Sequence, residues 1–307
     1  MGAVVVDNIV KTYGSKKEKI TALKGVSLNV QKGELFGIIG PDGAGKTSLF
    51  RVLTTLLLPD GGSAKVDGWD VVKDYKAIRN SVGYMPGRFS LYQDLTVAEN
   101  MEFFATIFNT TIEENYDLVK DIYSQIEPFK DRRAGKLSGG MKQKLALSCA
   151  LIHRPSILFL DEPTTGVDAV SRKEFWEMLK RLKQQGITIL VSTPYMDEAS
   201  LCDRVALIQT GSIMSVDTPQ GIINQFRQPI VSVKADNMLY LLNDLKAFPG
   251  QQDAYPFGEY HHVILKDKSQ ETLLKEYLAG KSHMHLELKE TRPDIEDCFM
   301  ALMKAHE

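Results

Sequence analysis

The sequence predicts an α/β fold in which a sheet of parallel, buried strands is followed by a second, smaller α/β domain. Short, continuous apolar runs alternate with helical segments, as in doubly wound sheets whose strands are buried on both faces. These runs lie at 35–39, 157–160 and 187–191. After Pro219 the pattern changes to three strand–helix pairs, with strands expected near 230–235, 260–265 and 283–290. We therefore place a domain boundary near residue 220.

The composition is that of an ordinary globular chain. Its 307 residues correspond to about two domains of ~150 residues each. Hydrophobic residues make up 43% and charged residues 25%, which argues against disorder and fibrous architectures. The 37 Lys and Arg residues nearly balance the 39 Asp and Glu residues, giving a formal net charge of −2. This balance argues against nucleic acid as a partner, because nucleic-acid-binding domains usually carry a basic stripe.

Neither a membrane span nor a disulfide framework is expected. No apolar stretch approaches the ~20 residues that a membrane span needs, and the first residues lack the pattern of a secretory signal. The three cysteines are far apart and lack metal-ligand spacing. Cys149, Cys202 and Cys298 are therefore predicted to be buried thiols of a protein in a reducing compartment.

Local patterns predict the remaining elements in chain order. Residues 1–35 are expected to form short strands with a turn at 13–15, and a helix is expected from Thr47 to about Leu58. Residues 88–150 have mainly helical patterns. The last helix is the clearest, because an apolar face follows a Pro-Asp start that suits a first turn. This face consists of Ile295, Cys298, Phe299, Leu302 and Met303.

A phosphate-binding pattern, G-x-x-x-x-G-K-[ST], is present at Gly40-Pro41-Asp42-Gly43-Ala44-Gly45-Lys46-Thr47. The glycines allow consecutive backbone N–H groups to surround phosphate oxygens, and the following helix directs its positive end at them. Lys46 would reach the β- and γ-phosphates, and the hydroxyl of Thr47 would ligate Mg²⁺. The strand before and the helix after favour this interpretation over a glycine-rich turn without a ligand.

A pair of acids, Asp161 and Glu162, directly follows the apolar run at 157–160. An acid at the end of a buried strand lies at the carboxyl edge of the sheet, where α/β proteins bind their ligands. Asp161 suits the Mg²⁺ shell, and Glu162 suits polarising an attacking water molecule. Alone, the pair would be an ordinary strand end, but beside a phosphate loop it indicates nucleotide hydrolysis.

A third motif, Leu137-Ser138-Gly139-Gly140, lies about twenty residues before the acids. Together, the three motifs resemble those of the ATP-binding subunit of an ABC transporter, and the resemblance covers residues 1 to about 220. It implies a P-loop fold of the ABC ATPase type, with a mixed sheet core, an N-terminal antiparallel β subdomain and a helical subdomain at about 88–150. Ser138 alone would be an ordinary helix cap. The resemblance implies that Ser138, Gly139 and Gly140 bind the γ-phosphate of ATP held by another subunit.

The resemblance implies further roles for matching residues. Tyr13 matches the aromatic residue that stacks on adenine, and Ser48 continues the nucleotide-binding segment after Thr47. Asp168 matches the acid of a loop that crosses the interface between two ATPase subunits. The helical subdomain would receive a coupling helix from a membrane subunit. Residues 221–307 resemble the accessory C-terminal α/β domain of ABC-2-type exporter ATPases.

Two positions depart from the family pattern. A glutamine that links the metal and the attacking water to the membrane subunit is replaced by Gly87. A histidine that contacts the γ-phosphate is replaced by Pro194, which has neither a side-chain donor nor a backbone N–H. We therefore expect this chain's own site to bind ATP and to hydrolyse it slowly, with the intact Glu162 sustaining residual turnover. In this respect the chain resembles the degenerate first half of tandem exporter ATPases.

The function expected from these features is that of an ATP- and Mg²⁺-binding subunit that powers an ABC-2-type exporter. Its expected partners are transmembrane permease subunits and a second, non-identical ATPase subunit, which places it at the cytoplasmic face of the membrane. Two alternatives remain at this stage. One is a regulatory ATP-binding module with little or no turnover, and the other is a soluble ABC ATPase outside transport.

Overall fold

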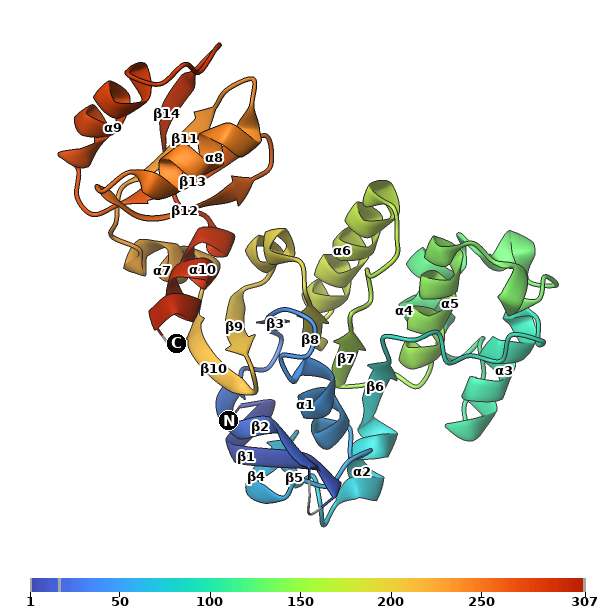
Figure 1. Ribbon diagram of the computed structural model, residues 1–307. Helices are drawn as coiled ribbons and strands as arrows, with labels where there is room; N and C mark the ends of the chain where they lie inside the picture. The colour runs from blue at the N-terminus through green and yellow to red at the C-terminus, as the bar shows by residue number, and fades with distance from the viewer. Residues whose placement is uncertain (1, 16–17, 306–307) are drawn as a thin grey trace. The chain divides into compact units, whose positions relative to one another are not determined.

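The computed structural model describes residues 2–15 and 18–305, and the chain divides into two compact units. The first unit is Met1–Pro219 and the second is Gln220–Glu307. The first unit contains two sheets and the second contains one, and each unit has its own hydrophobic core, so each is described by itself below (Figure 1).

The first unit is built on a six-stranded mixed sheet with the order β10-β9-β3-β8-β7-β6. Five of its strands are parallel, and β10 pairs antiparallel with β9 at one edge. The strands are β3 (Leu35–Ile39), β6 (Val82–Met85), β7 (Ile157–Asp161), β8 (Thr188–Thr193), β9 (Arg204–Gln209) and β10 (Ser212–Asp217). Every residue of β3, β7 and β8 is buried, which explains their continuous apolar sequences. The predicted mixed α/β fold is confirmed.

A second, antiparallel sheet precedes this core, with the order β2-β1-β4-β5. Its strands are β1 (Val4–Ser15), β2 (Glu18–Val30), β4 (Gly61–Val66) and β5 (Trp69–Asp70). The predicted turn at 13–15 is wrong, because these residues pair with β2 as the end of a long, bulged hairpin strand. Irregular pairing at three places interrupts the alternation of apolar and polar residues from which the length of the strand could have been predicted.

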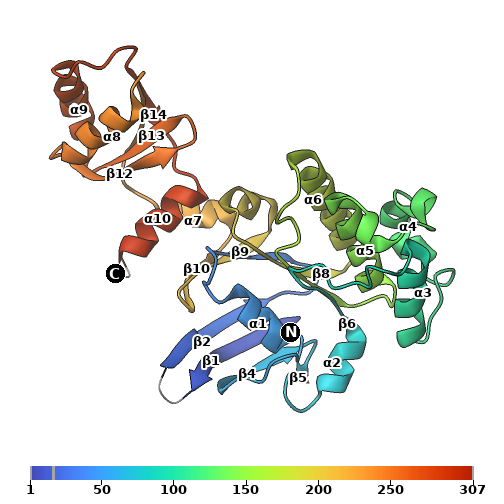
Figure 2. The ribbon, with the colours of Figure 1, turned by 45° about the vertical axis from the view of Figure 1, so that its right-hand side comes forward.

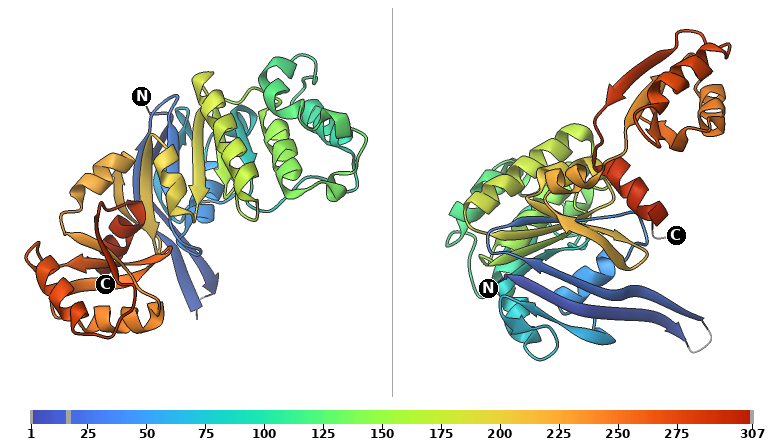
Figure 3. Two further views of the ribbon diagram at one scale, coloured as in Figure 1. Left: turned by 90° about the horizontal axis from the view of Figure 1, so that it is seen from above. Right: turned by 90° about the vertical axis from the view of Figure 1, so that its left-hand side faces the viewer.

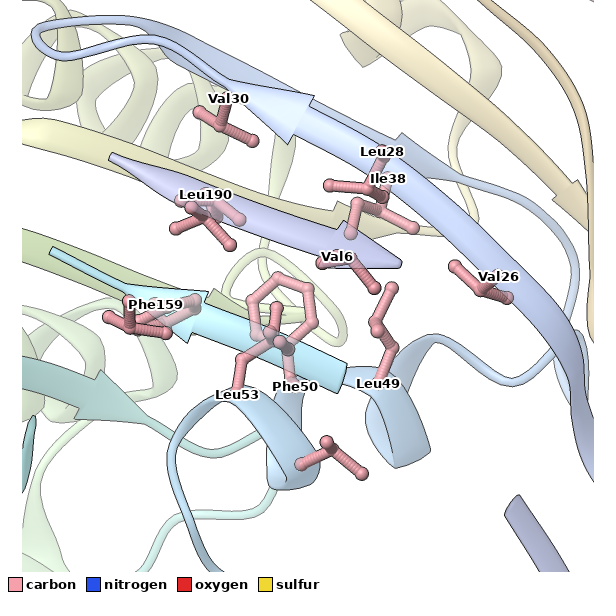
Figure 4. Close-up of a cluster of buried hydrophobic side chains, with 14 of the residues drawn as sticks. Val6, Val26, Leu28, Val30, Ile38, Leu49, Phe50, Leu53, Phe159 and Leu190 are labelled. Atoms are coloured by element: carbon pink, nitrogen blue, oxygen red, sulfur yellow. The ribbon is translucent and has the colours of Figure 1, made fainter. Parts of the chain in front are cut away.

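Helix α1 (Lys46–Leu53) lies between the two sheets and fills the core of the first unit (Figures 2 and 4). Phe50 of α1 and Phe159 of β7 are both fully buried, and their rings meet edge to face with centroids 5.7 Å apart. The helix ends at Leu53, earlier than predicted, because Thr55 adopts a left-handed backbone conformation with φ of 62°.

The predicted helical region at 88–150 contains three α-helices and two short 3-10 helices at one side of the first unit (Figure 1). They are α3 (Val97–Ile107), α4 (Tyr116–Tyr123), η1 (Glu127–Phe129), η2 (Ala134–Lys136) and α5 (Gly139–Leu151). Thr96 begins α3 with a complete capping box to Glu99. The remaining helices of the unit are α2 (Tyr75–Ser81), α6 (Ala169–Gln184) and η3 (Met196–Leu201).

The second unit is a four-stranded antiparallel sheet with β-α-β-β-α-β connectivity and the order β12-β13-β11-β14. This is the ferredoxin-like, split βαβ arrangement (Figure 3). Its elements are β11 (Ile230–Lys234), α8 (Met238–Ala247), β12 (Gln251–Phe257), β13 (Tyr260–Leu265), α9 (Gln270–Ala279) and β14 (Glu287–Thr291). The prediction missed β12, and β14 begins at Glu287, later than expected near 283.

Two helices, α7 (Pro219–Gln225) and α10 (Ile295–Ala305), flank this sheet in the sequence. Met300 of α10 packs with Ile230 and Ile264. α8 and α9 pack in a separate hydrophobic cluster with Val231 and Val263, the strand residues next to Ile230 and Ile264. Because successive strand residues point to opposite faces of a sheet, α8 and α9 cover the face opposite to Met300. A buried carboxylate, Asp297, ties α10 to the sheet by accepting hydrogen bonds from Tyr255 and His262, both at 2.7 Å.

None of the helices within 2–15 and 18–305 combines the length and the apolar character needed to cross a membrane.

The aromatic contact between α1 and β7 is predicted to be a major contribution to the stability of the first unit. Phe159→Ala should lower its free energy of unfolding by about 3–5 kcal/mol, because it removes a fully buried ring and leaves a cavity. Urea unfolding of the full chain followed by tryptophan fluorescence measures this, since both tryptophans, Trp69 and Trp176, belong to the first unit. Leu58→Ala, at a side chain that is 62% exposed, is the control, with an expected change within about 0.5 kcal/mol. An equal loss in both variants would contradict the assignment.

Candidate nucleotide-binding site

The phosphate loop connects β3 to α1, as the sequence predicts. Gly43 and Gly45 have φ values of 78° and 106°, in the left-handed region that suits glycine. A Cβ atom on Gly40 would lie 2.1 Å from the carbonyl oxygen of Ile208, and one on Gly45 would lie 2.4 Å from that of Ala22. The loop therefore requires glycine at the positions where the motif has it.

Lys46 lies at the start of α1 with its side chain buried inside the loop. Its ammonium group donates to the carbonyl oxygens of Gly40 at 2.8 Å and Pro41 at 3.0 Å. The same group pairs with Oε1 of Glu162 at 3.1 Å. The second predicted motif thus lies beside the first, and the carboxylate of Glu162 faces the phosphate loop.

Thr47 and Asp161 also meet at this edge of the sheet. The hydroxyl of Thr47 donates to Oδ1 of Asp161 at 3.2 Å, and the carboxylate of Asp161 is almost fully buried. Hydroxyl and carboxylate oxygens are the ligands that Mg²⁺ prefers, and the remaining ligands are usually waters and substrate phosphates. Within 2–15 and 18–305, no cluster of three or more His, Cys, Asp and Glu residues could hold a metal by itself. The pair fits Mg²⁺ bound together with a nucleotide.

Glu162 adopts a left-handed backbone conformation, with φ of 50°. For a residue with a side chain this costs of order 1–3 kcal/mol, and such strain is typical of functional sites. Its N–H donates to both the carbonyl oxygen and the hydroxyl of Ser192, each at 3.0 Å. Ser192 was not among the residues predicted from the sequence. What identifies Ser192 as a site residue is the sheet register, which places it opposite Asp161 on the neighbouring parallel strand.

Gly87 and Pro194, the two positions predicted to depart from the family pattern, follow β6 and β8, the strands on either side of β7. A Cβ atom on Gly87 would lie 3.0 Å from the carbonyl oxygen of Asp161, so this position is directly beside the acidic pair. A cavity of about 150 Å³ adjoins it and is lined by Gly87, Glu162 and Gly139 among others. Pro194 follows the last residue of β8, two positions after Ser192. A side chain at Gly87 could therefore reach the acidic pair, and Pro194 follows the strand that carries Ser192.

The third motif forms the start of a helix, but it does not complete this chain's own phosphate loop. Ser138 caps α5 by accepting a hydrogen bond from the N–H of Met141 at 3.4 Å. Gly140 packs so closely that a Cβ atom would lie 2.9 Å from Oγ of Ser171. Among the described residues, no hydrogen bond or ion pair joins Ser138, Gly139 or Gly140 to the loop at 40–47. The N-terminus of α5 therefore has the geometry of an anion site.

Comparison with known proteins decides the family. Residues 23–165 match the family described as ABC transporter. The chain is 36% identical to the Nod factor export ATP-binding protein I of Burkholderia lata over 300 aligned residues. The alignment covers 96% of this chain and 95% of that protein. The chain belongs to the ABC transporter ATP-binding family. The predicted recognition of an ABC transporter ATP-binding subunit is confirmed at this level.

Other members and solved structures agree with this ABC assignment. The probable multidrug ABC transporter ATP-binding protein YbhF of Escherichia coli is 37% identical over 92% of this chain, which spans about half (49%) of that protein. The doxorubicin resistance ATP-binding protein DrrA of Mycobacterium tuberculosis is 34% identical over 87% of this chain and 80% of its own length. A dimeric structure of the ATP-binding cassette MJ0796 with ADP and Pi has a TM-score of 0.64 and 28% identity, over 70% of this chain and 98% of that one.

Asp168 and Tyr13, the other predicted residues of the ABC site, lie at the start of α6 and in β1, respectively. Asp168 caps α6 by accepting from the N–H groups of Val170 and Ser171, and Ser171 holds the pKa of Asp168 below its usual value. The ring of Tyr13 is 38% exposed on β1, and its hydroxyl lies 3.1 Å from Oγ of Ser48. Tyr13 is thus next to the first turn of α1, and its role in stacking on adenine stays a prediction.

A buried carboxylate that the sequence did not single out, Glu198, connects two loops of the ABC site. It accepts hydrogen bonds from Thr164, beyond Glu162, and from Thr193, at the end of β8. Arg172 of α6 adds an ion pair at 3.1 Å. Because these partners lie up to 34 residues away in sequence, no local pattern identifies Glu198. The cluster holds the segments after β7 and β8 together.

Lys46 is predicted to be essential for nucleotide binding. Lys46→Met removes the only charge on the loop at 40–47 that attracts phosphate and should weaken ATP affinity by at least about tenfold, because hydrogen bonds to charged groups contribute ~1.5–3 kcal/mol. Isothermal titration calorimetry of the full chain with Mg²⁺ and a non-hydrolysable ATP analogue measures this. Lys19→Met, on the exposed β1–β2 hairpin, is the control and should leave the affinity unchanged. Equal affinities for the Lys46 variant and the wild type would contradict the assignment.

Proposed function

We propose that this chain is the ATP-binding, energising subunit of an ABC exporter and that it works as one half of an unequal pair. Residues 1–220 bind Mg²⁺ and ATP at the chain's own phosphate loop but turn ATP over slowly. Ser138, Gly139 and Gly140 complete the competent site of a second, non-identical ATPase subunit. Residues 221–307 form an accessory domain. The observation that carries this proposal is an otherwise intact ABC site flanked by Gly87 and Pro194.

The binding groups and the missing groups come from different strands. The loop after β3, with Lys46 and Thr47, retains every residue type that phosphate and Mg²⁺ need. The departures lie beyond β6 and β8, where the lost side chains would act on charge that develops during hydrolysis. Each lost donor of this kind typically costs about 10²–10³ in rate. Glu162 remains beside Lys46 and supports slow residual turnover.

Export is supported by the relatives, and a permease partner is supported by the helical region. The names of three relatives describe Nod factor export, a multidrug transporter and doxorubicin resistance. The lining of a groove of about 280 Å³ includes apolar side chains of the helical region, among them Leu91, Phe104 and Phe108, together with polar residues such as Arg79 and His153. A segment of a membrane subunit that docks here would hold this chain at the cytoplasmic face of the membrane.

A regulatory module without turnover is the second candidate, and Gly87 and Pro194 also favour it. The two functions differ in whether the motif Leu137-Ser138-Gly139-Gly140, the signature of this chain, completes a working site. In the regulatory alternative, ATP would bind and change the state of the complex, and neither site would depend on this signature.

Restoring the missing groups is predicted to raise ATP turnover. The wild-type chain alone should turn over far below the enzyme median of ~10 s⁻¹. Gly87→Gln with Pro194→His should raise the rate at least about tenfold, because two restored copies can complete each other with their intact signatures. The cavity beside Gly87 has room for part of the new side chain, although the Cβ lies close to the carbonyl of Asp161. A phosphate-release assay on the purified full chain measures this.

The matched control is Gly87→Met with Pro194→Phe, which adds comparable bulk without the polar groups. It should leave turnover at the wild-type level. A wild-type rate near ~10 s⁻¹ that Glu162→Gln abolishes would refute the impaired site. So would equal rates for the restored and the control variants.

Ser138→Arg tests the unequal pair in the assembled complex. The tagged chain is purified from detergent-solubilised membranes, and its companions are identified by mass spectrometry. We expect membrane-spanning chains and a second ATPase, with turnover reduced at least about tenfold by Ser138→Arg, because the arginine blocks the helix N-terminus. Ser200→Arg, at an exposed site on η3, is the control. Unaltered turnover in Ser138→Arg would favour the regulatory module, and an absence of membrane chains would refute the transporter.

A further inference from the structure

Ser192 is a buried hydroxyl residue at the carboxyl end of β8, between the strands that carry the two halves of the nucleotide site. β8 pairs in parallel with β3 on one side and with β7 on the other. In this register Ser192 lies opposite Ile38 and Asp161. Its side chain is fully buried, and a buried hydroxyl is costly unless it is hydrogen-bonded. The partners of Ser192 therefore indicate why a polar residue is present here.

These partners are the two acids of the site. The hydroxyl of Ser192 donates to Oδ1 of Asp161 at 2.6 Å. The same hydroxyl accepts a hydrogen bond from the N–H of Glu162 at 3.0 Å, and the carbonyl oxygen of Ser192 accepts from that N–H as well. One side chain thus orients the carboxylate of Asp161 and helps to hold Glu162 in its left-handed backbone conformation.

The other hydroxyl residues of β8 have different partners. Thr188, at the opposite end of the strand, accepts from the N–H of Gly33 at 3.0 Å. Thr193 donates to Glu198 at 2.6 Å. All three residues are buried, so burial alone does not distinguish Ser192. The direct contact with Asp161 and Glu162 does.

We propose that Ser192 is a positioning residue for Mg²⁺ and for the attacking water. It keeps the carboxylate of Asp161 turned toward Thr47, where the two residues would hold the metal, and it fixes the backbone from which Glu162 projects. The proposal rests on Mg²⁺–ATP binding at this chain's own phosphate loop. Without Ser192, Thr47 is the one remaining hydroxyl donor to Asp161 among the described residues, and Thr47 also has to ligate the metal.

The test measures the Mg²⁺ dependence of binding and does not require turnover. The full chain is titrated with Mg²⁺ in the presence of a fixed concentration of the non-hydrolysable analogue AMP-PNP. Ser192→Ala should raise the Mg²⁺ concentration for half-maximal binding about 10–100-fold, as the loss of a residue that orients a metal ligand typically does. Binding of the analogue without metal should stay within about threefold of wild type, because the loop and Lys46 are unchanged.

Two further variants at the same position separate the hydroxyl from the volume. Ser192→Cys is close to serine in size but a weak donor, so its Mg²⁺ midpoint should shift as in Ser192→Ala. Ser192→Thr keeps the hydroxyl, and its midpoint should return to within about threefold of wild type. Thr188→Val is the matched control, because it removes a buried hydroxyl from the same strand without touching the acids. Its midpoint should equal that of wild type.

Unchanged Mg²⁺ midpoints in both Ser192→Ala and Ser192→Cys would overturn the proposal, and so would a shift of equal size in Thr188→Val. A wild-type chain that binds AMP-PNP without any Mg²⁺ dependence would overturn it together with the metal role of Asp161. The unequal pairing of ATPase subunits is judged separately, because it is measured by turnover of the restored variant and of the assembled complex.

Discussion

The parallel register of β3, β8, β7 and β6 is the constraint on which the rest of the site depends. Adjacent parallel strands end at the same edge of a sheet, so whatever follows them is brought together. The phosphate loop follows β3, Pro194 follows β8, Glu162 follows β7, and Gly87 lies two residues beyond β6. Because β3, β7 and β8 are buried along their whole length, each strand is held by packing on both faces, and the register of the acids against the loop is fixed.

In the proposed function, this arrangement would also allow ATP binding and ATP turnover to be separated in one protein. Charge and hydrogen bonds for the phosphates come from one continuous segment, the loop and the first turn of α1. The groups proposed to act during hydrolysis follow three other strands, β6, β7 and β8. The absence of a glutamine at Gly87 or of a histidine at Pro194 would therefore not change the backbone of the loop or the position of Lys46. In the proposed function, substitution at these two positions would lower the hydrolysis rate and leave the ATP affinity unchanged, which a site built from a single segment would not allow.

The sequence predicted those parts of the structure whose physical cause is local. Continuous apolar runs gave the buried strands, and the phosphate loop was recognisable because glycine is required at Gly40 and Gly45 by close backbone approach. It did not predict β12, because Pro256 and a polar start mask an edge strand of which only two residues are buried. Nor did it identify Ser192 or Glu198. Each has at least one partner 30 or more residues away, which only the sheet register and the packing bring into contact.

The geometry of the signature helix bears on the form of the assembly. The side-chain oxygens of Ser138 and Asp168 cap the helices that they begin, so both are held in place before any nucleotide arrives. In the proposed pair, this preorganised helix N-terminus, which makes no hydrogen bond to the loop at 40–47 among the described residues, would bind the nucleotide of the second cassette. In the proposed pair, that cassette must supply the glutamine and the histidine that Gly87 and Pro194 replace. The signature of the second cassette would contact only the slow site, which is built on this chain's own phosphate loop. Because rapid turnover is not required at that site, the sequence of the second cassette's signature is the one that can vary in the proposed pair.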